Sequence, residues 1–152
     1  MRLENKVAIV VGGGQSPGET MGNGRATAVL FAREGAKVLV GDNRLDSAEE
    51  TAALIRAEGG VAEAVAVDVT EEASIEAMVA RCLDLWGRID VLHNNVGVSI
   101  AGGDAQITEI TSEAFDRVVS INLKGMVLTC KHVIPVMHAQ KSGSIVSISS
   151  IT

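Results

Sequence analysis

The chain has 152 residues, of which 47% are hydrophobic and 21% charged. This size and composition are typical of one ordered globular domain, here residues 1–152, and they exclude collagen-like, disordered and disulfide-scaffold proteins. The formal net charge is −6 and the Lys and Arg residues are scattered, so nucleic acid is not an expected partner.

Neither export nor membrane insertion is expected from the sequence. The start at 1–6 is polar, and no apolar run is long enough to cross a bilayer. Cys82 and Cys130 lack CxxC spacing, which predicts buried, reduced thiols in a cytoplasmic protein.

The first unit along the chain is predicted to be a strand, a glycine loop and a helix. Residues 6–11 form a continuous apolar, β-branched run, typical of a strand buried on both faces, and Gly12 ends it. Apolar residues recur at helical spacing over 24–34, and Gly35 follows where a left-handed C-terminal cap is favoured.

The rest of the chain continues this alternation of strands and helices. The expected elements are a strand at 36–41, a helix opened by Asp46 and closed at Gly59, a strand at 61–67, a helix capped by Thr70 and running to Leu85, a strand at 88–93, a loop at 94–109, a helix at 111–139 and a strand at 144–149. Such a pattern predicts the α/β class: a doubly wound, Rossmann-like parallel sheet of five strands with helices on both faces. The last strand is an expected exposed edge.

The glycine loop lies where an open parallel sheet binds ligands, beyond the carboxyl ends of its strands. Bare main-chain amides at the following helix N-terminus suit a diphosphate, which makes Gly12, Gly22, Asn23 and Gly24 candidate cofactor-binding residues. A merely structural turn is the alternative.

Asp42 follows the second strand, where a carboxylate can accept hydrogen bonds from ribose hydroxyls and repel an added phosphate. This favours NAD as the cofactor. NADP is the alternative, because Arg44 could pair with a 2′-phosphate. A solvated turn residue is the alternative role for Asp42.

Further polar motifs follow at the ends of later strands. They are Asp68-Val69, Asn94-Asn95-Val96-Gly97, and Asn122 with 147–150. In this order the motifs resemble those of the classical short-chain dehydrogenase/reductase family, over 5–152 of this chain.

The resemblance implies roles for residues around the cofactor. Asp68 and the Val69 backbone would hold the adenine, while Asn94, Asn95 and Gly97 would steady the centre of the sheet and leave room beside the cofactor ribose. Asparagine suits this because it both donates and accepts hydrogen bonds. A structural turn is the alternative for the asparagine pair.

Two catalytic residues are implied in the same way. Asn122 would organise a water in a proton relay, with a solvent-facing asparagine as the alternative. Ser150 matches the family serine that hydrogen-bonds the substrate oxygen, and Ser149 is the neighbouring candidate. Neither serine is an expected acyl-transfer nucleophile, since no Gly-x-Ser-x-Gly elbow surrounds it.

The glycine loop is longer than the family spacing. That spacing fits Gly18 with Gly22 and Gly24, but we favour Gly12 as the first glycine because it must turn directly off the strand. The intervening residues 15–20 then form an insertion of unknown contact with the phosphates.

The family's Tyr-x-x-x-Lys pair belongs after the fifth strand, whereas this chain has no Tyr and ends at Thr152. We therefore interpret the chain as a truncated or partial member, inactive by itself. The resemblance implies hydride transfer between nicotinamide and a small-molecule carbonyl or secondary alcohol, in a homo-oligomer.

Two other functions stay open. They are a non-catalytic NAD-binding or scaffold module and, more remotely, an S-adenosylmethionine-dependent methyltransferase. No metal site is expected, because His93, His132 and His138 show no ligand spacing with carboxylates or cysteines.

Overall fold

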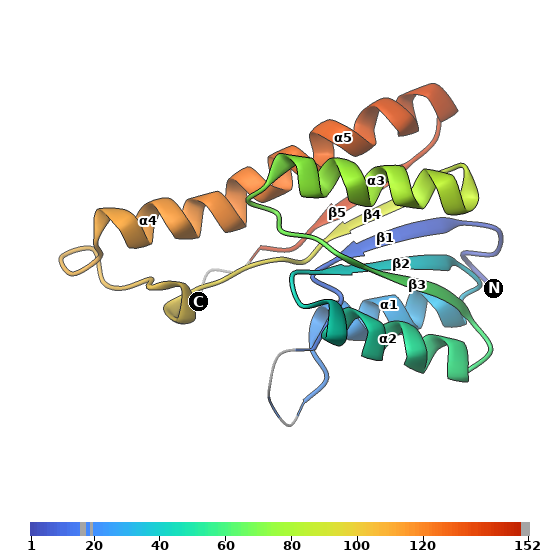
Figure 1. The fold of residues 1–152 in the computed structure, drawn as a ribbon, viewed down its shortest axis with the longest axis horizontal. Helices are drawn as coiled ribbons and strands as arrows, with labels where there is room; N and C mark the ends of the chain where they lie inside the picture. Colours follow the sequence, from blue (N-terminus) through green and yellow to red (C-terminus); the bar gives the residue numbers. More distant parts are fainter. Residues whose placement is uncertain (16–17, 19, 150–152) are drawn as a thin grey trace.

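The computed structural model describes residues 1–15, 18 and 20–149, which form a parallel sheet in the order β3-β2-β1-β4-β5 with helices on both faces (Figure 1). The predicted doubly wound class is confirmed. The elements are β1 (Val7–Val11), α1 (Asn23–Arg33), β2 (Lys37–Asp42), α2 (Leu45–Ala57), β3 (Val61–Ala66), α3 (Glu72–Trp86), β4 (Val91–Asn94), a 3₁₀ turn η1 (Ile100–Gly102), α4 (Ser112–Val119), a π-helical turn η2 (Ser120–Lys124), α5 (Gly125–Gln140) and β5 (Ser144–Ser147).

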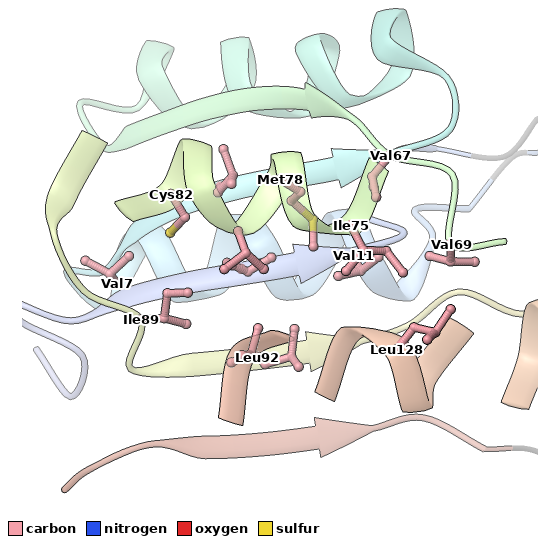
Figure 2. Close-up of a cluster of buried hydrophobic side chains, with 14 of the residues drawn as sticks. Val7, Val11, Val67, Val69, Ile75, Met78, Cys82, Ile89, Leu92 and Leu128 are labelled. Atoms are coloured by element: carbon pink, nitrogen blue, oxygen red, sulfur yellow. The ribbon is translucent and has the colours of Figure 1, made fainter. Parts of the chain in front are cut away.

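The central strand β1 serves two separate apolar clusters because its side chains alternate between the faces of the sheet. Ala8 and Val10 pack under α1 and α2, where small side chains such as Ala28 and Ala48 let the helices lie close. Ile9 packs on the opposite face with α3 and α5, in the cluster drawn in Figure 2. Both faces of β1 are therefore covered, as its unbroken apolar sequence predicts.

Two predicted helix caps are wrong. The residue that caps α2 is Arg44 rather than Asp46, and Glu71 rather than Thr70 caps α3; neither true cap makes a side-chain hydrogen bond to the helix. The Thr70 hydroxyl is already engaged, because it donates to the Asp68 carboxylate at 2.7 Å. Thr70 and Asp46 thus hydrogen-bond to neighbouring residues instead of capping the helix. Sequence pattern alone does not distinguish these two uses of a polar side chain near a helix start.

The predicted helix at 111–139 is present but is not regular. Thr111 caps it as an acceptor from the Ala114 N–H at 3.2 Å. Its middle widens into the π-helical turn η2, so that the Gly125 N–H bonds to the carbonyl of Ser120, five residues back. Such turns are frequent at functional sites, and this one contains Asn122.

The last two strands are shorter than predicted. β4 starts at Val91 and includes Asn94, which the sequence placed in the following loop, and β5 stops at Ser147. No β5 residue is fully buried, and Val146 is 43% exposed, so the expected exposure of this strand is confirmed.

The two cysteines are free thiols, as predicted, but only Cys82 is fully buried. Burial, with a smaller contribution from Asp90, raises the pKa of the Cys82 thiol to about 12. That thiol is therefore neutral and unreactive at ordinary pH. Among the described residues, no helix has the length and apolar character needed to span a membrane.

Candidate functional site

The candidate site lies at the carboxyl ends of β1, β2 and β4. Val11, Gly41 and Asn94 occupy one level of the sheet, because Val11 pairs with the other two. The strand order changes direction between β1 and β4, and this switch point is where doubly wound sheets bind ligands.

The chain turns off β1 at Gly12, which has a φ of +78°. The N–H groups of Gly12 and Gly13 both donate to the Gly41 carbonyl, at 2.8 and 3.0 Å. The Gly14 N–H then donates to Asp42 Oδ2 at 2.9 Å, where a Cβ on Gly14 would lie 2.6 Å from that oxygen. Glycine is needed here because the loop runs directly along the end of β2.

Gly24 permits the closest approach in the site. A Cβ at this position would lie 1.8 Å from the Gly12 carbonyl oxygen. The same oxygen accepts a hydrogen bond of 3.1 Å from Asn95 Nδ2. The start of α1 is thus held against the turn at the end of β1.

The N-terminus of α1 is open to an anion. Its cap residue is Gly22, no side chain caps the helix, and the first turn carries no acid. The unpaired amides and positive end of such a helix attract phosphate.

Asp42 is the last residue of β2, and its carboxylate is held by two main-chain amides. Oδ2 accepts a hydrogen bond from the Gly14 N–H, and Oδ1 accepts one from the Arg44 N–H at 3.1 Å. A carboxylate has about four lone-pair positions, so it can still accept bonds from a diol. The Arg44 guanidinium lies 3.7 Å from Asp46.

Asp68 and Val69 follow β3, the strand next to β2, at the same edge of the sheet. The Asp68 side chain is exposed and bonds to Thr70, whereas Val69 is buried and packs against Gly125 at the start of α5. A Cβ on Gly125 would lie 2.9 Å from the side chain of Val69, so α5 and this segment are in close contact.

Asn94 is buried at the centre of the sheet and links three elements. Its Oδ1 accepts from Thr129 Oγ1 of α5 at 2.8 Å, and its Nδ2 donates to Ser147 Oγ of β5 at 3.4 Å. Beside it lies a small cavity of about 10 Å³, between β1, β4, η2 and α5. Asn94 therefore ties β4 to α5 and β5 at the centre of the sheet.

Asn122 makes two hydrogen bonds to the backbone of Val98. Its Oδ1 accepts from the Val98 N–H and its Nδ2 donates to the Val98 carbonyl, both at 2.8 Å. The solvent-facing alternative is therefore wrong, and the side chain fixes the loop after β4. Gly97 lies in this loop, with Asn122 Oδ1 as the nearest atom to a Cβ there, at 3.8 Å.

Of the two serine candidates, only Ser149 is among the described residues. Ser149 is exposed, one residue beyond Ile148, whose N–H bonds to the Asn94 carbonyl at 2.9 Å. Ser150 lies outside the described residues.

A group that sequence spacing did not reveal joins α3 to α5. Glu72, Glu76 and His132 bring potential ligand atoms within 4.8 Å of one another. Lys131 also pairs with Glu72, and hydrogen bonds from Lys131 and His132 lower the pKa of the Glu72 carboxyl. The members come from helices far apart in sequence, so only the fold could bring them together. The absence of a metal site stays a prediction.

A larger open groove, of about 500 Å³, lies away from the carboxyl ends of the strands. It is lined by the last turns of α5 and the chain that follows, from Ile134 to Gly143. It is remote from the glycine loop and from Asp42, so we place the candidate site at the strand ends.

Comparison with known proteins identifies related proteins. The family model described as short chain dehydrogenase matches residues 6–152. The uncharacterized oxidoreductase YxbG of Bacillus subtilis is 41% identical over 151 residues, which are 99% of this chain and 52% of that protein. Sorbitol dehydrogenase of Cereibacter sphaeroides is 40% identical over 151 residues, covering 99% of this chain and 54% of that protein.

A solved structure has the same fold. A Burkholderia xenovorans protein provisionally assigned as a short-chain dehydrogenase/reductase superposes with a TM-score of 0.91 at 42% identity, covering 98% of this chain and 57% of that one. The chain spans about half the length of the curated relatives it matches.

Proposed function

This chain belongs to the short-chain dehydrogenase family, which uses a nicotinamide cofactor, and from that premise we propose that it forms the NAD-binding part of an oxidoreductase. The reaction is hydride transfer between the nicotinamide and a small carbonyl or secondary alcohol substrate. The observation that carries the proposal is the Asp42 carboxylate bonded to Gly14 of the glycine loop, which leads to the N-terminus of α1. When bound, the dinucleotide supplies the carbon that gives or takes the hydride.

The residues at the strand ends would contact successive parts of a dinucleotide. Main-chain amides of Asn23 and Gly24 at the start of α1 would hold the diphosphate, while the Gly22 N–H is already bonded to Gln15 Oε1. Asp42 would accept hydrogen bonds from the adenosine ribose. Past it, the exposed Asp68 side chain and the Val69 backbone would hold the adenine.

NAD is favoured over NADP on the charge of Asp42, because a fixed carboxylate repels a 2′-phosphate. The neighbouring cation Arg44 could reverse that preference. Its guanidinium lies 3.7 Å from the Asp46 carboxylate, however, and the negative charge of Asp46 weakens the attraction between Arg44 and a 2′-phosphate.

Residues after β5 and in η2 would bind and orient the substrate. Ser150, or its neighbour Ser149, would donate a hydrogen bond to the substrate oxygen. Asn122 holds the loop after β4 through Val98, so a relay water would be held by its main chain rather than by its occupied side chain. These 152 residues include no Tyr, and we propose that the chain alone binds cofactor without turnover.

A second candidate is a non-catalytic NAD-binding or scaffold module. Both candidates require the cofactor site. They differ in whether a longer form of the protein carries a general acid, such as the family tyrosine, and turns over substrate. The exposed apolar side chains of α5, including Val127 and Ile134, support a homo-oligomer in either case.

Calorimetry of the 152-residue chain with NADH and NADPH tests the proposal. We expect NADH to bind at least about tenfold more tightly than NADPH, and Asp42→Asn to weaken NADH roughly tenfold because it removes charge-assisted hydrogen bonds. Asp84→Asn, which removes an exposed acid on α3, is the matched control. Absence of NADH binding at millimolar concentration would overturn the assignment.

A further inference from the structure

Gln15, the first residue of the inserted part of the glycine loop, bonds to both ends of that loop. Its main chain is fixed to α2, since its N–H donates to Ser47 Oγ at 2.6 Å and its carbonyl accepts from the same hydroxyl at 3.1 Å. Ser47 is buried, so this attachment is firm. Gln15 also follows Gly14, whose N–H is bonded to Asp42.

The side chain of Gln15 reaches the far end of the loop. Its Oε1 accepts from the Gly22 N–H at 2.9 Å, and its Nε2 donates to the Thr20 carbonyl at 2.8 Å. Gly22 is the cap residue of α1. One residue therefore connects the segment beside Asp42 with the start of the helix.

This connection matters because of what the two ends would bind. Under the proposed function, Asp42 binds the adenosine ribose and the start of α1 binds the diphosphate, two neighbouring parts of one ligand. A ligand that contacts two groups binds more tightly when their separation is fixed beforehand. The insertion lengthens the chain between them, and the Gln15 bonds offset the freedom that this adds.

We propose that Gln15 is a positioning residue of the dinucleotide site, which fixes the N-terminus of α1 relative to Asp42. The inference rests on the proposed function and adds a residue to it. Gln15 acts through the Ser47 hydroxyl and the Gly22 main-chain amide.

The test is Gln15→Met, which keeps the length of the side chain and removes its hydrogen bonds. We expect NADH and ADP to bind roughly tenfold more weakly, since two hydrogen bonds that order the site are lost. Adenosine, which has no diphosphate, is expected to keep its affinity within about twofold. NADH is measured by its fluorescence, and ADP and adenosine by competition. Gln106→Met, at an exposed glutamine of the loop before α4, is the matched control.

The outcomes separate this inference from the proposal beneath it. If the wild-type chain binds NADH and Gln15→Met binds it equally well, the role of Gln15 is overturned and the NAD site stands. If adenosine is weakened as much as NADH, Gln15 has only a structural role and the inference is also overturned. A wild-type chain that binds no NADH overturns the proposed function itself.

A second variant covers the case in which Gln15→Met does not fold. Ser47→Ala removes the other attachment of Gln15 and leaves its side chain intact. The same selective loss for NADH and ADP is expected, and equal affinity for NADH in this variant would contradict the inference.

Discussion

Around β1 and β2 both faces of the sheet are covered, whereas around β5 much of the apolar surface is open. All five residues of β1 are buried, and β2 is buried from Val38 to Gly41. In β5 the best-covered residue is the half-buried Ile145. The strands on the two sides of the candidate site therefore differ in burial: β1 and β2 are covered, and β5 is largely exposed.

The open side includes the helices next to β5. Exposed large apolar side chains follow one another along α4, η2 and α5, with Phe115 at 54%, Leu123 at 60%, Val127 at 58% and Ile134 at 50% exposure. The β1 and β2 side of the candidate site is thus built by locally complete packing. The β4 and β5 side leaves large apolar side chains exposed.

Gly24→Ala is expected to have the largest effect on the closed side. The new Cβ would overlap the Gly12 carbonyl, and since both atoms belong to the backbone neither can rotate away. We expect a loss of more than about 3 kcal/mol in the free energy of unfolding, measured in urea. Gly22→Ala is the control, because φ is −65° there and the nearest atom is 3.6 Å away. Equal urea midpoints for the two variants would contradict the close packing of α1.

Asp90→Asn tests the contact between β1 and the segment just before β4, where the closed side meets the open side. Asp90 is buried, accepts the Val7 N–H at 2.9 Å, and pairs with Arg88 and Lys6. We expect a loss of about 1–3 kcal/mol at pH 7, with exposed Asp84→Asn as the control.

The effect of Asp90→Asn has a predictable pH dependence. Burial raises the pKa of the Asp90 carboxyl, but hydrogen bonds from Arg88 and the Val7 N–H outweigh it and hold the pKa below its usual value. The stabilisation is therefore full above the usual aspartate pKa and is lost as the pH falls through the lower folded value. A difference between wild type and variant that stays constant down to pH 2 would contradict this.

Lysine substitutions at Val127 and Ile134 test the open side. We expect the wild-type chain to self-associate in sedimentation velocity, and the double lysine variant to become monomeric with less than about 0.5 kcal/mol change in stability per site. Val61→Lys, at a 48% exposed valine of the closed side, should leave association unchanged. A wild-type chain that sediments as a monomer would remove the distinction between the two sides.

His93→Leu should give the smallest effect. His93 pairs with Val10 and Val146, its Nε2 has no hydrogen-bond partner among the described residues, and burial lowers its pKa. Since the unfolded chain takes up the proton first, stability should fall as the pH drops below about 6.5 toward the lowered folded value. The variant should lose this dependence in urea titrations, and His138→Gln, an exposed position, should retain it.

Sequence reasoning succeeded where one physical cause dominates. The apolar run of β1 and the spacing of α1 predicted those elements because buried strands and amphipathic helices have distinct periodicities. Gly12 was identified because a turn directly off a strand favours glycine, and its φ of +78° agrees.

It failed where two local interactions compete or where distant residues meet. Thr70 could cap a helix or bond to Asp68, and only the folded chain decides between them. The two bonds of Asn122 to Val98 and the side-chain reach of Gln15 depend on how loops return to the helices. No periodicity encodes those distances.

The π-helical turn at Ser120–Lys124 changes how the surface of this helix should be engineered. One additional residue in a turn rotates everything that follows by about 100° relative to a regular helical wheel. A wheel drawn from Thr111 to Gln140 as a single helix would therefore assign residues of α5 to the wrong side. Deleting one residue within the turn would straighten the helix, rotate α4 against α5 and withdraw Asn122 from Val98.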